Sequence, residues 1–174
     1  MKTKLALGAI LLSVSILCFG QQVSVNYNRA QDFSQYHTYA WGGNNANQIR
    51  NSILAQEAQT DITASLQGKG LTMVAESENP DLIVVVSGGM KEQTSYQTWG
   101  GGLGWGGWGG MGTITPEQST VGTLIVDIYD AKGKSLVWRG VGQNTLSTNG
   151  NKNTQMVQKA VTKMFQQYPW PPKK

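Results

Sequence analysis

The clearest alternation of apolar and polar residues lies between Gly122 and Val141 and predicts a β-hairpin. Asp130 opens its turn, and Gly133 stands where a three-residue loop with a bulge needs a left-handed residue. Because successive side chains of a strand point to opposite faces, pairing Asp130 with Lys134 fixes the register of both strands. This register places Val126 opposite Trp138, Ile128 opposite Leu136 and Leu124 opposite Gly140, all on one face.

The other face of this predicted hairpin carries two charged residues. Asp127 lies diagonal to Arg139 in the expected register, at a spacing across which a salt bridge can form. An acid working beside an anion clamp is the alternative, but a cross-strand ion pair explains both side chains with fewer assumptions. We therefore expect a structural salt bridge here.

Other segments have the composition or period of strands. The run Asp81–Ser87 is almost continuously β-branched, as in a strand at the centre of a sheet, and Lys91–Thr98 alternates enough to continue it toward solvent. Shorter strands are expected at Val23–Tyr27, Thr38–Trp41 and Leu71–Val74.

Two segments have helical periodicity. The first helix is expected at Asn47–Gln67, where Ile49, Ile53, Ile62 and Leu66 recur near helical spacing. A polar loop, Gln143–Gly150, precedes the second helix, for which Asn153 is the expected cap and Pro169 the end. Its apolar stripe consists of Val157, Ala160, Val161, Met164, Phe165 and Tyr168.

Strands combined with one early and one late amphipathic helix predict an α+β fold. We expect a mainly antiparallel sheet with both helices packed on one face. The chain shows no internal repeat and no linker, so residues 21–174 are expected to form a single domain.

The first twenty residues have the pattern of a secretory signal peptide. Lys2 and Lys4 precede an apolar core, Leu5–Leu17, that is too short to span a bilayer of roughly 30 Å. Gly20 is the small residue expected just before the cleavage site. The alternative is a lipoprotein signal in which Cys18 receives the lipid, although Leu17 is larger than the residue usually found before such a cysteine.

Composition argues against several classes of function. Cleavage after Gly20 removes Lys2 and Lys4 and lowers the net charge from +4 to +2, which the terminal Lys173 and Lys174 account for. No clustered basic face for nucleic acid is therefore expected. The processed chain would contain no cysteine, and its single histidine, His37, has no nucleophile or metal-ligand motif beside it. We expect no enzyme activity, cofactor or metal site.

The segment Trp99–Gly112 is the most unusual one in composition. Its glycines formally match a dinucleotide-binding fingerprint at Gly102, Gly104 and Gly107, but no helix follows to receive a pyrophosphate, so nucleotide binding is not expected. A flexible loop between two strands is the simplest interpretation. The alternative gives Trp99, Trp105 and Trp108 a contact role, because indole rings suit membrane interfaces, sugar rings and partner grooves.

Several short motifs resemble those of one bacterial family. They are Asp32-Phe33 with Tyr36, Thr38, Tyr39 and Trp41; Leu66 with Gly70; Pro80-Asp81-Leu82; Gly122-Thr123-Leu124 with Asp127 and Asp130; and Leu136-Val137-Trp138-Arg139-Gly140. On these residues the chain resembles the domain of unknown function 4136 family, short exported proteins that are often lipoproteins. The resemblance implies an envelope location and a compact α+β fold, and no particular activity.

Three functional hypotheses follow. The first is a non-enzymatic module of the cell envelope, periplasmic or secreted and in one variant associated with the outer membrane. It would contact a protein partner or a membrane surface through the Trp-Gly segment or an open sheet edge. The second is a carrier or sensor that holds a small ligand or glycan between sheet and helices. The third is a hydrolase without a recognisable motif, with His37 as its best catalytic candidate.

Overall fold

The computed structural model describes residues 22–42, 52–99 and 113–169. The predicted signal peptide, its cleavage site after Gly20 and the alternative lipidation site Cys18 lie outside the described residues, as do Trp105 and Trp108. The described elements are β1 (Gln22–Tyr27), β2 (Thr38–Trp41), α1 (Ser52–Gly68), β3 (Thr72–Met73), β4 (Leu82–Trp99), β5 (Thr113–Asp130), β6 (Ser135–Thr145) and α2 (Gly150–Phe165), with 3-10 turns at Phe33–Gln35 and Glu76–Glu78.

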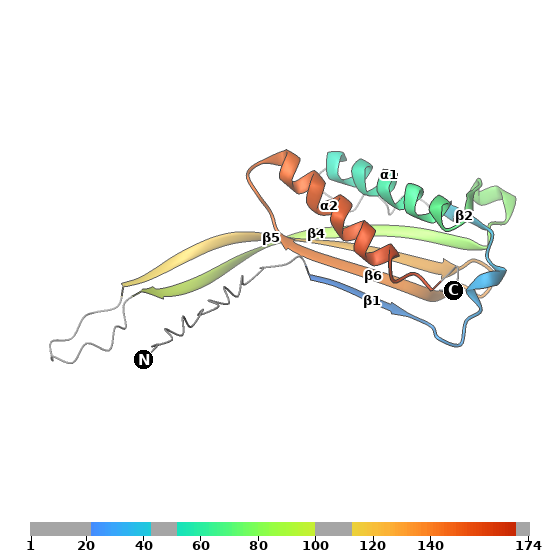
Figure 1. Cartoon of the computed structure of the whole chain (residues 1–174), viewed down its shortest axis with the longest axis horizontal. Helices are drawn as coiled ribbons and strands as arrows, with labels where there is room; N and C mark the ends of the chain where they lie inside the picture. Colours follow the sequence, from blue (N-terminus) through green and yellow to red (C-terminus); the bar gives the residue numbers. More distant parts are fainter. Residues whose placement is uncertain (1–21, 43–51, 100–112, 170–174) are drawn as a thin grey trace, which may run out of the picture.

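The strands form one sheet in the order β1-β6-β5-β4-β2-β3. The neighbouring pairs β1–β6, β6–β5 and β5–β4 are antiparallel, whereas β2 runs parallel to both of its neighbours, β4 and β3. Both helices lie side by side on the same face of this sheet (Figure 1). The predicted α+β class, with a mainly antiparallel sheet and both helices on one face, is therefore confirmed.

The core lies between this sheet face and the two helices. Along β4 the buried side chains alternate with half-buried ones, as expected for a strand covered by helices on one side. The strands contribute Tyr39, Leu82, Val84, Val86, Leu124, Val126, Ile128 and Trp138, and the helices contribute Ala58, Ile62, Leu66, Ala160, Val161, Met164 and Phe165.

The predicted hairpin is present, but its register is different. A bulge at Val137 lies between the pairs Tyr129–Leu136 and Ile128–Trp138. The pairing is shifted by two positions: one because Asp130 pairs with Ser135 rather than Lys134 at the turn, and one because of the extra residue in the bulge. Val126 therefore lies opposite Gly140 rather than Trp138, and Leu124 opposite Gly142. The shift also removes Leu136 from the core face: it is 40% exposed, while Val137 is buried.

The turn of the hairpin also differs from the prediction. The left-handed residue is Lys134, with a φ of 50°, and not Gly133. The Gly133 N–H instead donates a hydrogen bond to the Asp130 carboxylate, which links the first residue of the turn to its third loop residue. A local side-chain hydrogen bond of this kind stabilises the turn without a left-handed glycine.

Both helices need a correction at their first turns. Ile53, expected on the packing face of α1, is 70% exposed, and burial begins at Ala58. The cap of α2 is Asn149, whose side chain accepts from the Asn151 N–H at 3.0 Å. Asn153, the expected cap, bonds Ser147 through both its oxygen and its nitrogen at 2.8 Å, and so fixes the preceding loop. That loop is shorter than predicted because β6 continues to Thr145.

Two glycines of β6 allow α2 to approach the sheet closely. A Cβ atom on Gly140 would lie 2.6 Å from Cη2 of Trp138 and 2.9 Å from the sulfur of Met164. At Gly142 it would lie 2.8 Å from Cε of Met164. The space that these glycines leave is thus filled by the Trp138 indole, which stacks on Phe165 at 5.1 Å between ring centroids, and by the side chain of Met164.

We predict that Gly140→Ala lowers the free energy of unfolding by about 1–3 kcal/mol, because the methyl group overpacks a filled core. The matched control is Gly89→Ala in β4, where a Cβ atom would meet nothing within 4 Å. Urea unfolding of both variants measures the difference. Equal stability of the two variants would contradict the packing described for Gly140.

Candidate functional site

The most prominent surface feature is a two-stranded extension of the sheet. β4 and β5 pair without interruption from Leu82–Asp130 to Trp99–Thr113, whereas β6 stops at Thr145, opposite Val121. Residues 92–99 and 113–120 therefore continue as a pair of strands, which we call the β4–β5 ribbon. Eight residue pairs correspond to about 25 Å of projection, and Figure 1 shows the ribbon leaving the body well beyond the helices.

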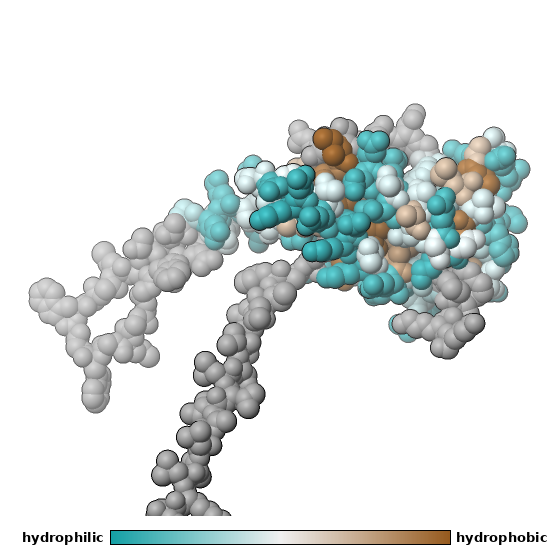
Figure 2. Space-filling view, turned by 45° about the horizontal axis from the view of Figure 1, so that its top comes forward, coloured by the Kyte–Doolittle hydropathy of each residue, from teal (hydrophilic) through white to brown (hydrophobic). Residues whose placement is uncertain are grey.

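The described part of the ribbon has a polar, solvent-exposed surface. Glu92, Gln93, Thr94 and Ser95 are exposed on β4, as are Pro116, Glu117 and Gln118 on β5. Figure 2 shows this extension as mainly hydrophilic, in contrast to the apolar areas of the body. Because a two-stranded ribbon without a buried face has little stability of its own, the body must hold it in place.

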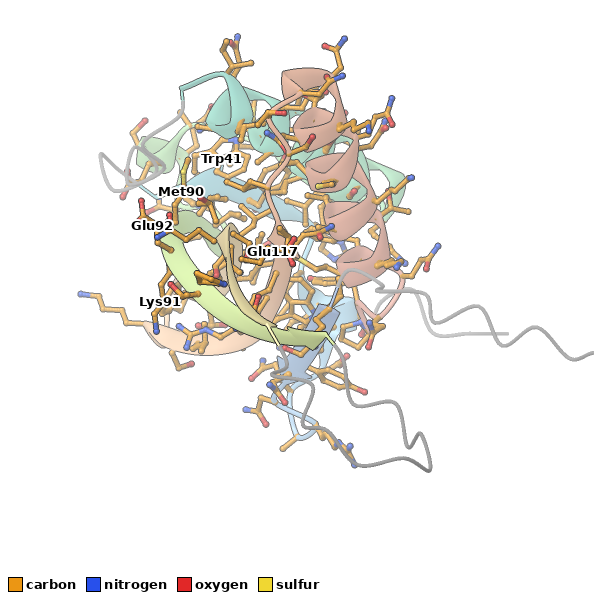
Figure 3. All side chains as sticks on the ribbon, turned by 90° about the vertical axis from the view of Figure 1, so that its left-hand side faces the viewer. Trp41, Met90, Lys91, Glu92 and Glu117 are labelled. Carbon is orange, nitrogen blue, oxygen red and sulfur yellow. The ribbon has the colours of Figure 1, made fainter. Side chains whose placement is uncertain are left out.

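Two apolar side chains, Trp41 at the end of β2 and Met90 in β4, lie near the base of the ribbon. Figure 3 shows Trp41, Met90 and Glu92 in that order away from the helices, with Glu117 on the neighbouring strand. Met90 is 46% exposed, while Trp41 packs against the core and contacts Tyr39 edge to face at 6.5 Å. Apolar surface thus reaches the point where the polar ribbon begins.

The ribbon places the Gly- and Trp-rich segment at its far end. The prediction that Lys91–Thr98 continues the central strand is confirmed, since β4 ends at Trp99. β5 begins at Thr113, nine residues before the predicted hairpin strand, and this early start was not predicted. Of the three candidate contact residues, only Trp99 belongs to a described strand.

A cavity between sheet and helices bears on the ligand-carrier hypothesis. Its volume is about 70 Å³, roughly half of the 150 Å³ that an engineered apolar cavity needs to bind benzene. Ligand pockets usually measure about 300–1,000 Å³. This cavity is too small for a sugar or lipid and gives the carrier hypothesis no support. It is lined mainly by Leu54, Met90, Leu124, Leu146, Met156 and Val157.

Asp127 and Arg139 form the predicted ion pair. They lie directly opposite each other rather than diagonally, because of the two-position shift in the register of the hairpin. Two hydrogen bonds join them, Nε to Oδ1 at 2.5 Å and an Nη to Oδ2 at 2.7 Å, and Asp127 is only 7% exposed. The hydrogen bond to Asp127 and its charge raise the pKa of Arg139. Both oxygens of the carboxylate are engaged, which fits a structural role.

A second group of polar residues connects three separate segments at the opposite end of the sheet from the ribbon. One carboxylate oxygen of Asp81 accepts from the main-chain N–H of His37 and from the N–H and hydroxyl of Thr38, each at 3.0 Å. The Tyr36 hydroxyl donates to Asp130 at 2.9 Å. These contacts fix the chain before β2 to the start of β4 and to the end of β5.

His37 takes part in this group through its main chain alone. Its side chain is exposed, and no hydrogen bond of its ring occurs among the described contacts. The described ranges also contain no group of three His, Cys, Asp or Glu residues arranged to hold a metal ion. None of the described helices has the length and apolar character needed to cross a membrane.

Asp81 predicts a pH dependence of stability. Burial raises its pKa, but the hydrogen bonds from His37 and Thr38 outweigh that effect, so the pKa lies below its ordinary value of about 4. A carboxyl whose pKa is lower in the folded state than in the unfolded state stabilises the fold fully at pH values above its unfolded-state pKa. This contribution is lost as the pH falls through the folded-state pKa. We therefore expect Asp81→Asn to be less stable than the wild type at pH 7, by about 1 kcal/mol or more.

The difference between wild type and Asp81→Asn should shrink as the pH falls below about 4, because the wild-type carboxyl becomes protonated. Urea unfolding of both proteins between neutral and acidic pH measures it. A difference that stays constant over that range would contradict the assigned role of the carboxylate.

The fold is a two-layer α+β fold. Residues of the short motifs identified in the sequence, such as Asp81, Asp127 and Arg139, form the contacts that hold its strands together. Residues 23–170 match the family described as Domain of unknown function (DUF4136). The chain belongs to this family, as its short motifs indicated.

Solved structures with a similar fold include a DUF4136 family protein from Bacteroides thetaiotaomicron. It has 19% sequence identity and a TM-score of 0.53, and the match covers 86% of this chain and 96% of that one. A PDZ domain protein from Parabacteroides distasonis has 16% identity and a TM-score of 0.56 over 88% of this chain, which spans 37% of that protein. At these identities the likeness concerns the fold alone. No curated protein matches the chain.

Proposed function

We propose that this protein is a non-enzymatic binding module of the cell envelope. Its body is a scaffold, and the β4–β5 ribbon carries the Trp99–Gly112 segment to a protein partner or a membrane surface. The observation that supports this proposal best is the ribbon itself, two strands of eight paired residues that extend past every other described element.

The chemistry of the ribbon fits a contact role. Its polar side chains keep the ribbon soluble, and its length separates the segment beyond Trp99 from the body. Tryptophan combines a large apolar ring with one hydrogen-bond donor, so it suits membrane interfaces and the centres of protein contacts. In the sequence, glycines separate Trp99, Trp105 and Trp108, and glycine is the residue with the fewest restrictions on its backbone conformation.

The proposed location outside the cytoplasm rests on the signal-like pattern of residues 1–20. With cleavage after Gly20 the protein would be periplasmic or secreted, and its attachment to other envelope components would depend on the ribbon. With lipidation at Cys18 it would be held at a membrane, and the ribbon would be free to reach about 25 Å from the body.

The use of the polar residues supports a non-enzymatic role. Asp81, Asp127 and Asp130 hold other parts of the fold through hydrogen bonds, as described above. His37, the best candidate for a hydrolase, is exposed beside a carboxylate that already accepts three hydrogen bonds. A general base needs a partner within hydrogen-bond reach that orients it, and the described contacts of His37 supply none.

The direct test removes Gly100–Gly112 and joins Trp99 to Thr113 with Asn-Gly, which favours a tight hairpin turn. We expect an unchanged melting temperature, because the segment lies beyond the ribbon, and loss of association with envelope material in a pelleting assay. The matched control replaces Trp99, Trp105 and Trp108 by Ala and keeps the length of the segment.

Two further arms separate the possible partners. Binding to protein-free lipid vesicles that disappears in the deletion variant identifies a membrane surface. Binding to envelope material that is lost after protease treatment of that material identifies a protein. Association that persists unchanged in the deletion variant would refute the proposed role of the segment.

A further inference from the structure

The two long edges of the β4–β5 ribbon can be distinguished by the direction of their main-chain groups. In a strand, the N–H and C=O of one residue point to the same side, and this side alternates along the chain. The Gly42 N–H donates to the Val84 carbonyl at 2.9 Å, so the groups of Val84 point away from β5. Since β4 pairs with β5 without a register shift, the even-numbered residues of β4 point outward along its whole length.

The same reasoning applies to β5. The Leu146 N–H donates to the Thr120 carbonyl at 2.7 Å, so the even-numbered residues of this part of β5 also point away from their partner strand. Pro116 is one of them. Proline has no N–H to donate, and in sheets it is confined to such open positions. The β5 edge of the ribbon is therefore interrupted in its middle, a common protection against pairing with another strand.

The β4 edge has no such interruption. Glu92, Thr94, Tyr96 and Thr98 present outward N–H and C=O groups, and no described strand pairs with this edge beyond Val86. The seven residues Gln93–Trp99 contain no charge, proline or glycine. Segments of this length with strand-forming residues and no charge readily pair with identical copies of themselves.

We propose that a second copy of this chain pairs with the β4 edge, antiparallel and around a two-fold axis at Ser95. Pairing of identical strands around such an axis gives a closed dimer, because the same patch is used on both copies. The result is a four-stranded sheet in which the two β4 strands are central and the two β5 strands, with Pro116, form the outer edges. This inference does not depend on the function proposed above.

Charge and space disfavour registers centred closer to the body. An axis at Lys91 or Glu92 would set two like charges opposite each other, which destabilises a strand pair. An axis at Gln93 would bring Trp99 of the second copy opposite Ser87, which belongs to the body because β5 is still paired with β6 there. With the axis at Ser95, Lys91–Trp99 pairs with the same range of the second copy, so the pairing covers the ribbon and only one residue of the body. Gln93 then lies opposite Gln97, and Thr94 opposite Tyr96, a β-branched residue against an aromatic one.

The stability of this dimer would come from main-chain hydrogen bonds. The outward residues Glu92, Thr94, Tyr96 and Thr98 of each copy would exchange about eight of them across the axis. Replacing one outward residue by proline removes one main-chain N–H donor from each copy and places a proline ring between the two β4 strands. The position in β5 that lies opposite Thr94 is Gln118, which also points outward, but to the edge that would remain free.

Sedimentation equilibrium of the full chain, as purified from its host, tests the proposal. We expect a reversible dimer for the wild type, and a dimer dissociation constant at least about tenfold higher for Thr94→Pro. The matched variant Gln118→Pro should dimerise like the wild type. A wild-type chain that stays monomeric at all concentrations, or equal weakening by both prolines, would overturn the proposal.

Cysteine cross-linking tests the register in a chain that is otherwise unaltered at the edge. Residues facing each other at the axis, outside the hydrogen-bonded pairs, have Cα atoms about 4.5 Å apart, within reach of a disulfide. Under oxidation Ser95→Cys should form a covalent dimer, whereas Gln93→Cys, opposite Gln97, and the unsubstituted chain should not. Cross-linking of Gln93→Cys as strongly as Ser95→Cys would overturn the register.

A different occupant of the edge would also be visible. If the chain is monomeric but Thr94→Pro, and not Gln118→Pro, loses binding to an envelope protein, the edge accepts a strand from that protein. Self-pairing would then be refuted, while the loop deletion described above would still decide the role of Trp99–Gly112.

Discussion

The close approach of α2 to the glycines of β6 joins the helical layer to the sheet. Gly140 leaves space that the Trp138 indole and the Met164 side chain fill, and Phe165 stacks on the same indole. Tyr168 and Phe33 continue this contact through ring pairs at 5.5–6.0 Å. A chain of aromatic rings thus joins the end of α2 to the segment before β2, and with it to the hydrogen bonds of Asp81.

This arrangement explains the family motifs as parts of one folding unit. The Leu-Val-Trp-Arg-Gly motif supplies the bulge at Val137, the indole, the partner of Asp127 and the glycine beneath α2. The motif before β2 supplies Phe33 for the ring contacts and Thr38 for the hydrogen bonds to Asp81. Residues that look like candidates for chemistry are therefore engaged in holding strands, turns and helix together. The ribbon lies outside this unit.

The sequence predicted most elements of the body because their signals are local. The two short strands β1 and β2, the buried run in β4 and the apolar stripe of α2 each depend on periodicity within a few residues. The predicted hairpin register was wrong because the turn is one residue longer than expected and because a bulge adds another residue, which leaves no mark in an alternating pattern. The prediction therefore assigned Leu136 and Val137 to the wrong faces. The prediction for Ile53 was wrong because periodicity identifies a helix face but does not show which turns of that face are covered.

The candidate site was only partly accessible from the sequence. Composition drew attention to Trp99–Gly112 and to a polar strand before it, but the strand after it was missed. Thr113–Val121 contains a proline and has little apolar alternation, and none of the ribbon side chains whose burial is described is buried. Its strand conformation comes from pairing with β4, and this pairing cannot be predicted from the local sequence pattern. The difference between the two ribbon edges likewise depends on hydrogen-bond parity, which the sequence alone does not contain.

The body forms one cooperative unit, and the ribbon is a separate projection held by it. Native-state amide hydrogen exchange, at concentrations below those at which chains associate, tests this most directly. We expect amides of Val85 and Val126 to exchange only by global unfolding, and those of the ribbon, such as Gln93, to exchange through local opening of much lower free energy. Ribbon amides as protected as those of the core would contradict the claim, because the ribbon would then be part of the packed body.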